Sequence, residues 1–423
     1  MSPTFRALAN RNYRIYIVGS VLSNTGTWMQ RVAQDWLVLQ LTHSGTALGI
    51  TTGLQLLPAL LFSPVAGVVA DRVPKRTVLR FTQVAMALPA ALLGILAVTG
   101  VVQTWHVYAL AFVFGIGTAF DAPARQSFVV EIVGRDDLAN AVGLNSASFN
   151  VARMIGPAVA GVLIAALGSG ASAAGWVILI NAVSYLPVFI SLNLLDGSLL
   201  RPSPVTGTRK RAVRDGVAYV RSRPDLVLIL CCVFFVGTFG MNFQMTSALM
   251  ATSVFHKGAG EYGLLASIMA VGSLAGALLA AGRAKPRLLF VVLAGAAFSL
   301  IEIGSGLMPS YVTFAAVLPF LGLAALTMIT SANAMIQMTS SPMMRGRVAA
   351  LYMMIFLGGT PFGSPLIGWV GETFGARWML IGGGAMSFLG IAVATAWYAR
   401  RENLALSDYG RANHDSLVSP RAA

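Results

Sequence analysis

The sequence predicts an all-α membrane protein whose twelve transmembrane helices form two six-helix bundles. Three observations carry this prediction: twelve long apolar stretches, an unequal distribution of basic residues, and one long polar connection near the middle of the chain. Of the 423 residues, 56% are hydrophobic and only 10% are charged. Such a composition leaves no room for a soluble catalytic domain, so we do not expect an enzyme.

Each apolar stretch is long enough for a helix to cross about 30 Å of hydrocarbon, which takes roughly 20 residues. The opening Met1–Tyr13 is polar and basic, and the apolar stretch after it is too long for a secretory signal. The expected spans are 15–39, 46–70, 77–100, 105–128, 139–168, 174–195, 225–252, 260–282, 287–308, 311–335, 346–371 and 377–399.

Lysine and arginine lie mostly on one side of this topology. With the N-terminus inside, 25 of the 29 basic residues fall on the inner side, and only Lys257 and Arg377 lie in outer loops. The positive-inside rule therefore predicts a multi-pass membrane protein with both termini in the cytoplasm. The net charge of +14 is explained by loops that face anionic lipid, and we expect no nucleic-acid partner.

The polar connection from Asp196 to Pro224 divides the spans into six and six. We expect an N-terminal bundle (1–195), a cytoplasmic linker (196–224), a C-terminal bundle (225–399) and a disordered cytoplasmic tail (400–423). Six spans preserve orientation, so the halves would be parallel copies. A shift of 207 residues places Gly156 on Gly363 and Gly161 on Gly368, although glycine is common enough in membrane helices for a chance match.

The loop after the second span, Gly67 to Leu79, has the sequence GVVADRVPKRTVL. It resembles the signature G-x-L-A-D-R-x-G-R-K-x-x-L of the major facilitator superfamily, with Pro74 in place of the second glycine. The resemblance implies a cytoplasmic gate, with Asp71 at the N-terminus of span eleven, where a helix dipole favours an anion. Arg125 could link to Asp71 or to Glu131 at this gate, or take part in proton movement. The expected gate residues are Gly67, Asp71, Arg72, Lys75, Arg76, Arg125 and Glu131.

Span five carries a second resemblance. Gly143, Gly156, Pro157 and Gly161 follow the antiporter signature G-x8-G-x3-G-P-x2-G-G, with alanine at two of its glycine positions. The Gly-Pro pair permits a bend in a span that rocks against its partner. With the first span and Asp121–Gln126, these residues resemble the proton-driven exporters that include macrolide-efflux and enterobactin-efflux proteins. The resemblance covers essentially the whole chain and implies the major facilitator fold in a bacterial cytoplasmic membrane.

Ionisable residues inside a bilayer are costly and mark functional sites. A proton-coupled carrier needs a carboxylate whose pKa burial raises toward neutrality, and the candidates are, in order, Asp35, Asp121 and Glu302. Arg31 and Asp35 are four residues apart, as are Asp121 and Arg125. The two residues of each pair therefore share a helix face, and their opposite charges could partly neutralise each other. Such buried pairs can also be purely structural.

A cavity for varied substrates should combine aromatic and methionine side chains with a few polar groups. Polar residues in spans also join helices by hydrogen bonds, so each candidate could serve packing instead. The sequence has neither a Walker-type phosphate loop nor a metal-ligand spacing, so we expect no cofactor and no metal, with the proton gradient as the energy source. The cavity candidates are Trp28, Gln30, Arg31, Gln34, Asn145, Asn150, Asn242, Gln244, Met245, Asn333 and Gln337.

Together these features predict a secondary transporter that works by alternating access. It would export hydrophobic or amphiphilic small molecules, such as drugs, secondary metabolites or siderophores, in exchange for protons. The expected partners are the lipid bilayer, a small-molecule substrate and protons, and we expect a monomer. Two alternatives stay open: an uptake symporter or facilitator of the same fold, and a non-transporting membrane receptor.

Overall fold

The computed structural model describes residues 3–134, 137–201, 212–281 and 287–402, and within them the chain is helical throughout its regular structure. The first half contains η1 (Pro3–Ala9), α1 (Arg11–Thr42), α2 (Gly45–Arg72), α3 (Lys75–Val98), α4 (Thr104–Val133), α5 (Leu138–Ala166), α6 (Ala171–Leu194) and the short turn η2 (Gly197–Leu199).

The second half contains α7 (Ala212–Arg221), α8 (Pro224–Phe235), η3 (Val236–Gly240), α9 (Phe243–Leu249), η4 (Met250–Val254), α10 (Ala259–Ala281), α11 (Leu288–Gly306), α12 (Tyr311–Thr339), α13 (Arg345–Gly358), α14 (Thr360–Phe374) and α15 (Ala376–Arg401). The tail expected beyond Glu402 lies outside the described residues.

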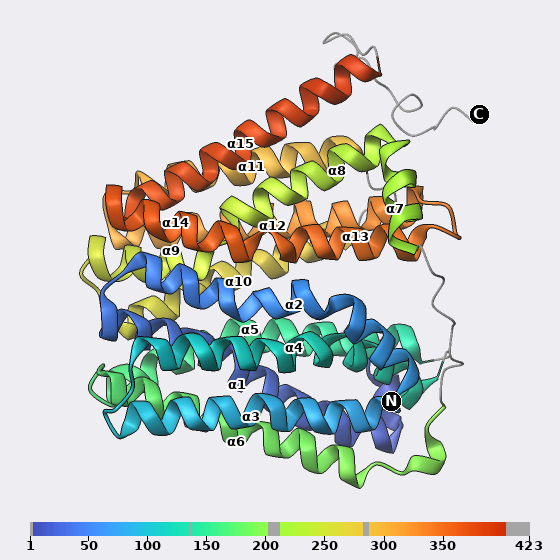
Figure 1. Cartoon of the computed structure of the whole chain (residues 1–423), viewed down its shortest axis with the longest axis horizontal. Helices are drawn as coiled ribbons and strands as arrows, with labels where there is room; N and C mark the ends of the chain where they lie inside the picture. The colour runs from blue at the N-terminus through green and yellow to red at the C-terminus, as the bar shows by residue number, and fades with distance from the viewer. Residues whose placement is uncertain (1–2, 135–136, 202–211, 282–286, 403–423) are drawn as a thin grey trace.

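Eleven helical segments in the described residues are long and apolar enough to cross a membrane. The remaining span, α1, is 32 residues long but carries Arg31 and Asp35 within its apolar sequence. Figure 1 shows α1 running beside the other helices of the first half. The prediction of an all-α membrane protein with twelve transmembrane helices in two six-helix bundles is confirmed, with observed bounds close to the expected ones.

Local sequence sets where several helices begin. The Asn10 side chain accepts a hydrogen bond from the Tyr13 amide at 3.2 Å and caps α1, and the Ser44 hydroxyl accepts one from the Ala47 amide at 3.1 Å and caps α2. Between them, His43 adopts a left-handed conformation with φ 51°. These side chains satisfy backbone donors that a helix start leaves unpaired, which permits a tight turn between α1 and α2.

Two spans are interrupted where the sequence predicted continuous helices. Span seven contains two π-helical turns, η3 and η4, and span eleven divides into α13 and α14 at Gly359. Pro361 follows that break and cannot donate the backbone hydrogen bond that would continue α13. Interruptions of this kind are frequent at functional positions and hinges.

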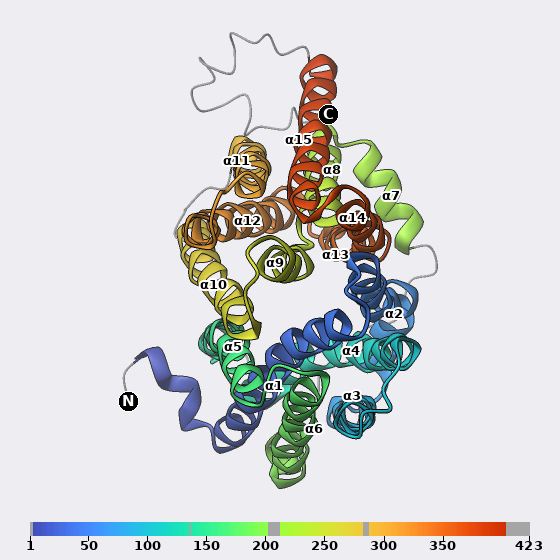
Figure 2. The same ribbon diagram turned by 90° about the vertical axis from the view of Figure 1, so that its left-hand side faces the viewer.

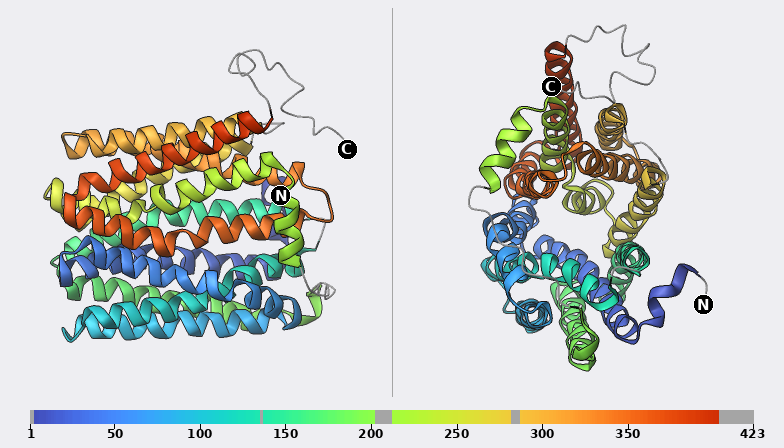
Figure 3. Two further views of the ribbon diagram at one scale, coloured as in Figure 1. Left: turned by 45° about the horizontal axis from the view of Figure 1, so that its top comes forward. Right: turned by 90° about the vertical axis from the view of Figure 1, so that its right-hand side faces the viewer.

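The linker contains a helix that the sequence analysis did not predict. In Figure 1, α7 runs across the direction of the spans, at the end of the molecule where η1 begins and α15 ends. We call this end the linker end and the other the opposite end. Viewed from the linker end, α7 lies on the perimeter, outside α8 and α13 (Figure 3). Residues 202–211 of the linker lie outside the described residues.

The two bundles meet along two pairs of helices, α2 with α14 and α5 with α10 (Figure 2). In the first pair, Gly45, Gly49 and Gly53 share one face of α2 and lie against the backbone of α14 at Gly368, Ser364 and Pro361. A side chain at any of the three glycines would collide with that backbone. Small residues at spacings of four are what close packing of membrane helices requires.

Small residues also allow close packing in the second pair, α5 with α10. Gly161 lies against Gly260 and Gly263 of α10, while Gly156 lies against Trp28 of α1. In α14, Gly368 contacts Gly45 of the other bundle, and Gly363 contacts η3 of its own bundle. The glycines matched by the 207-residue shift therefore occupy equivalent packing positions, which supports a true internal repeat.

We predict that a large side chain at Gly49 weakens contact between the bundles at the opposite end. In a background without the native cysteines, Ser44→Cys and Glu372→Cys should be joined by a short bifunctional thiol reagent. Adding Gly49→Leu should slow that cross-linking about tenfold, because overpacking costs about 1–3 kcal/mol.

The matched control is Gly143→Leu, because a Cβ at Gly143 meets nothing within 4 Å. Both variants are first shown to be monodisperse and folded at the temperature of the assay. Equal cross-linking rates in the two variants would contradict the observed contact between α2 and α14.

Candidate functional site

Five hydrogen bonds join the two bundles in the described part of the chain; the one between Arg153 and Ser273 lies near mid-span, and the other four lie toward the opposite end. Three come from charged side chains of α1 and α5. The Asp35 Oδ2 atom accepts from the Tyr262 hydroxyl at 2.8 Å, Arg153 donates to the Ser273 hydroxyl at 2.7 Å, and Arg31 donates to the Gln244 Oε1 atom at 3.5 Å. Charged groups of the first bundle thus bind polar groups of the second.

Asp35 is a carboxylate held across the bundle interface. Its side chain is buried, with 7% of the residue exposed, and Tyr262 is fully buried. Arg31 lies one turn before Asp35 on the same face of α1 but forms no ion pair with it in the described structure, because its guanidinium is directed to Gln244. The hydrogen bond to Tyr262 can exist only while α1 and α10 are in contact.

Two cations flank an aromatic ring beside Asp35. The guanidinium carbons of Arg31 and Arg153 lie 4.8 Å and 5.8 Å from the centroid of the Trp28 ring, and Trp28 makes an edge contact with Phe149 at 5.7 Å. Cation–π attraction compensates in part for burying such charges. The cluster formed by Trp28, Arg31, Asp35 and Arg153 carries one more cation than acid, and we call it the interface cluster.

Asp121 is satisfied within its own bundle. Its Oδ1 atom accepts hydrogen bonds from Thr82 at 2.7 Å and Gln83 at 2.8 Å, and its Oδ2 atom pairs with Arg125 at 2.7 Å. The pair expected from the i,i+4 spacing of Asp121 and Arg125 is therefore formed. A carboxylate with three donors in one bundle is a packing element of that bundle.

Glu302 lies inside the second bundle. It is 1% exposed, and its Oε2 atom has no hydrogen-bond partner within the described residues. A Cβ built on Gly240 of η3 would lie 2.9 Å from that atom, so the carboxyl group packs beside the first π-helical turn. The structure keeps Glu302 apart from the hydrogen bonds that join the bundles.

The cavity candidates divide into two groups. Gln30 accepts from Asn181 of α6, and Asn242 accepts from Ser364 of α14 at 2.6 Å, so both connect helices within one bundle. Trp28, Arg31 and Gln244 instead lie where the bundles meet. The remaining candidates are Gln34 and Met245, which are buried, Asn145, Asn150 and Asn333, which are half-buried, and Gln337, which is exposed.

Three of the gate candidates, Lys75, Arg76 and Glu131, connect helices of the first bundle at the linker end. Lys75 pairs with Glu131 at 3.0 Å, with both side chains less than 10% exposed, and Arg76 donates to the Leu192 carbonyl at 2.6 Å. Arg125 pairs with Asp121 rather than with Asp71 or Glu131. Asp71 and Arg72 are exposed, and a Cβ at Gly67 would meet nothing within 4 Å.

The sequence analysis did not identify Glu372 of α14, which closes the opposite end. Its Oε2 atom accepts from the Ser44 hydroxyl at 2.5 Å and from the Thr46 amide at 3.1 Å. A carboxylate at the N-terminus of α2 is favoured by the helix dipole. Tyr262 and Ser273 were also missed, because nothing local in their sequence indicates partners more than a hundred residues away.

Comparison with known proteins shows which family this chain resembles. Residues 2–416 match the family model described as transmembrane secretion effector. The chain is 24% identical to the staphyloferrin A transporter of Staphylococcus aureus over 63% of this chain and 66% of that protein. It is 29% identical to the multidrug efflux pump Tap of Mycolicibacterium fortuitum over 62% of this chain and 65% of the pump.

These two matches each span just under two thirds of the relative's length. The chain is also 23% identical to macrolide efflux protein A of Streptococcus pyogenes, over 86% of this chain and 91% of that protein. A bacterial homolog of the human lysosomal transporter Spinster, solved in an inward-facing, unoccupied conformation, has a TM-score of 0.68 at 16% identity, covering 94% of this chain and 98% of that chain.

The family match covers nearly the whole chain, and the structural likeness shows the same fold. The resemblance inferred from the loop after span two and from span five is confirmed, as is the macrolide-efflux branch among its relatives. The chain belongs to the transmembrane secretion effector family of major facilitator superfamily transporters.

Proposed function

We propose that this multi-pass membrane transporter exports hydrophobic or amphiphilic small molecules in exchange for protons, by alternating access. Relatives named as macrolide and multidrug efflux proteins support export of such molecules. The basic residues gather at the linker end, which makes that end cytoplasmic by the positive-inside rule. On this assignment the contacts between the bundles close the outer side.

The hydrogen bond between Asp35 and Tyr262 is the observation that carries the proposal. A buried carboxylate on the first bundle binds the second bundle only in the conformation that is closed at the opposite end. Its protonation and that closure are therefore thermodynamically linked, and each must alter the equilibrium of the other. Such a link is what proton coupling requires of a carrier, and it needs no cofactor.

Asp35 is favoured over the other two acids by its position. Asp121 has three donors within the first bundle, and Glu302 lies within the second, so movement of one bundle against the other leaves their surroundings intact. Asp35 alone of the three loses a partner when the bundles separate. We therefore assign proton coupling to Asp35, with Tyr262 as a positioning residue.

The interface cluster indicates which amphiphiles the site favours. Arg31 and Arg153 both contact the Trp28 ring, and Asp35 is the one acid of the interface cluster. A substrate with an apolar or aromatic body would pack on Trp28, and an anionic group on it would neutralise the second guanidinium. We propose amphiphiles that carry a carboxylate or a comparable anion as preferred substrates. The remaining parts of the proposal are a monomer and a bacterial plasma-membrane location.

The first prediction concerns proton coupling. Everted vesicles loaded with a pH-sensitive dye and energised should release protons when a transported amphiphile is added, and Asp35→Asn should abolish the release because asparagine does not titrate. The variant should still bind the substrate, since its amide keeps the shape of the carboxyl group and can still accept from Tyr262.

Glu302→Gln is the matched control, because it also neutralises a buried acid but leaves the bundle interface intact. Proton release should survive in that variant. Release that persists in Asp35→Asn but is lost in Glu302→Gln would move the coupling site into the second bundle. Accumulation of the substrate inside intact cells would instead identify an uptake carrier.

The second prediction concerns the substrate. Arg153→Gln should reduce transport of anionic amphiphiles about tenfold or more relative to neutral ones, because a hydrogen bond to a charged group contributes about 1.5–3 kcal/mol. Lys257→Gln removes a cation from outside the cluster and should leave the preference unchanged. The assay measures uptake of paired neutral and anionic compounds into everted vesicles; a parallel loss for both compounds would contradict the proposed role of Arg153.

The third prediction separates Asp121 from coupling. Asp121→Ala should lower the stability of the purified protein by about 3–5 kcal/mol, because it leaves the largely buried Arg125 without its ion-pair partner. Thr82→Val removes one donor and should cost only about 1–2 kcal/mol. Unfolding in detergent measures both effects; a fully stable Asp121→Ala protein that has lost proton release would restore Asp121 as a coupling candidate.

A further inference from the structure

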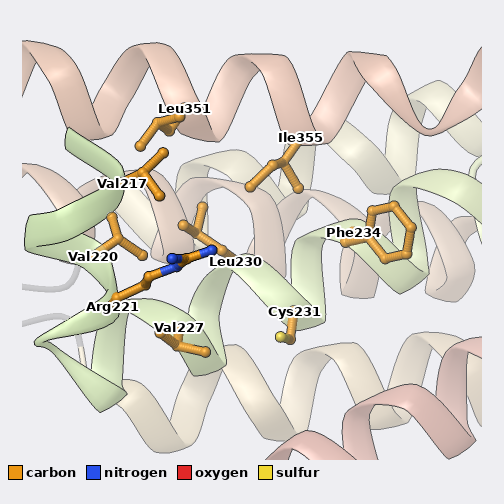
Figure 4. A pocket seen from close by; sticks show the side chains of 9 residues that line it. All are labelled: Val217, Val220, Arg221, Val227, Leu230, Cys231, Phe234, Leu351 and Ile355. Carbon is orange, nitrogen blue, oxygen red and sulfur yellow. The ribbon is translucent and has the colours of Figure 1, made fainter. Parts of the chain in front are cut away.

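A cavity at the linker end combines an apolar lining with one cation. It has a volume of about 320 Å³ and lies between α7, α8 and α13. Figure 4 shows the Arg221 guanidinium extending from α7 into this space, toward Leu230 of α8. The lining consists of Val217, Val220, Arg221, Val227, Leu230, Cys231, Phe234, Leu351 and Ile355.

The position of the cavity places it at the boundary between water and hydrocarbon. Its lining on α8 extends to Phe234, ten residues beyond the start of that helix, and on α13 to Ile355, ten residues beyond the start of α13. Because a helix rises about 1.5 Å per residue, both residues lie about 15 Å from the linker end. The cavity therefore runs from the membrane surface into the hydrocarbon layer, and α7 covers the end that lies at the membrane surface.

The walls of the cavity are fixed by polar contacts. Asp215 of α7 pairs with Arg347 of α13 at 3.1 Å, and the Tyr219 hydroxyl accepts from the Ser341 amide at 3.1 Å. These contacts hold α7 against α13 and against the loop that precedes it, while leaving space under the apolar face of α7. An amphipathic helix that lies along the surface in this way is typical of membrane interfaces.

Arg221 is the cation of this cavity. Arg223 nearby is bound by Asp225 at 2.6 Å, and its hydrogen bonds to Asp225 raise the pKa of that guanidinium. Arg221 has no hydrogen bond or ion pair within the described residues, and it is exposed although its guanidinium extends over apolar side chains. An anion attached to an apolar chain would complement both features.

We propose that this cavity binds one anionic phospholipid from the leaflet at the linker end. One acyl chain lies between α8 and α13, as far as Phe234 and Ile355, and the phosphate binds Arg221. The lipid thereby connects the linker helix to the second bundle. A comparable apolar cavity of about 270 Å³ between α2, α3 and α4 has no basic residue in its lining.

The test is native mass spectrometry of the full-length protein in detergent with phosphatidylglycerol or phosphatidylcholine of identical acyl chains. The wild type should retain one phosphatidylglycerol about fivefold more tightly than phosphatidylcholine, the effect of about one basic residue at a membrane surface. Arg221→Gln should remove this preference. Arg214→Gln is the matched control, because it removes the same charge from an exposed position of α7 outside the cavity, and it should preserve the preference.

Filling the cavity tests the acyl chain separately. Ile355→Trp should weaken retention of phosphatidylglycerol, with Val227→Phe as a second filling variant if the first is unstable in a thermal unfolding control. Equal losses in Arg214→Gln and Arg221→Gln would overturn the proposal in favour of general surface charge. Retention that depends on Arg221 but survives both filling variants would overturn it in favour of a simple phosphate contact.

Discussion

The close approach of helix backbones between the bundles is the constraint on which the rest of the structure depends. Glycines on α2 and α5 bring these helices into backbone contact with α14 and α10. Because membrane helices gain nothing from hydrophobic association in lipid, such packing and the hydrogen bonds it permits must hold the bundles together. The contact at α5 and α10 also brings Tyr262 to Asp35. One set of small residues therefore determines both closure and the surroundings of the proposed proton carrier.

The three buried acids show how position rather than residue type separates their roles. Among the described residues, Asp121 has its partners in one bundle and serves packing, whereas Glu302 is enclosed in the other bundle with one oxygen that has no hydrogen-bond partner there. Asp35 shares its hydrogen bond with a residue of the opposite bundle. A change of conformation must alter its environment, and by reciprocity a change in its protonation must alter the conformational equilibrium.

Most of the architecture could be predicted from the sequence, because the length of each span and the asymmetry of basic residues depend on short stretches of the chain. The same holds for the Asp121–Arg125 pair, whose spacing fixes it on one helix face. Arg31 and Asp35 have that spacing too, but Arg31 binds Gln244 in the other bundle, and contacts over such separations leave no local signal. The linker helix α7 is amphipathic and Pro361 stands just after the break in span eleven, so both had a local signal that a search for long apolar stretches passes over. The two π-helical turns of span seven have no comparable signal in the sequence.

The central claim is that protonation of Asp35 controls contact between the bundles at the opposite end. Spin labels at Val101 and Leu307, which are exposed near that end of the first and second bundles, would report the distance between them by pulsed electron resonance in nanodiscs, with the native cysteines replaced. The account predicts a distance distribution that changes with pH in the otherwise wild-type protein and does not change in Asp35→Asn. The same pH response in both proteins would contradict it.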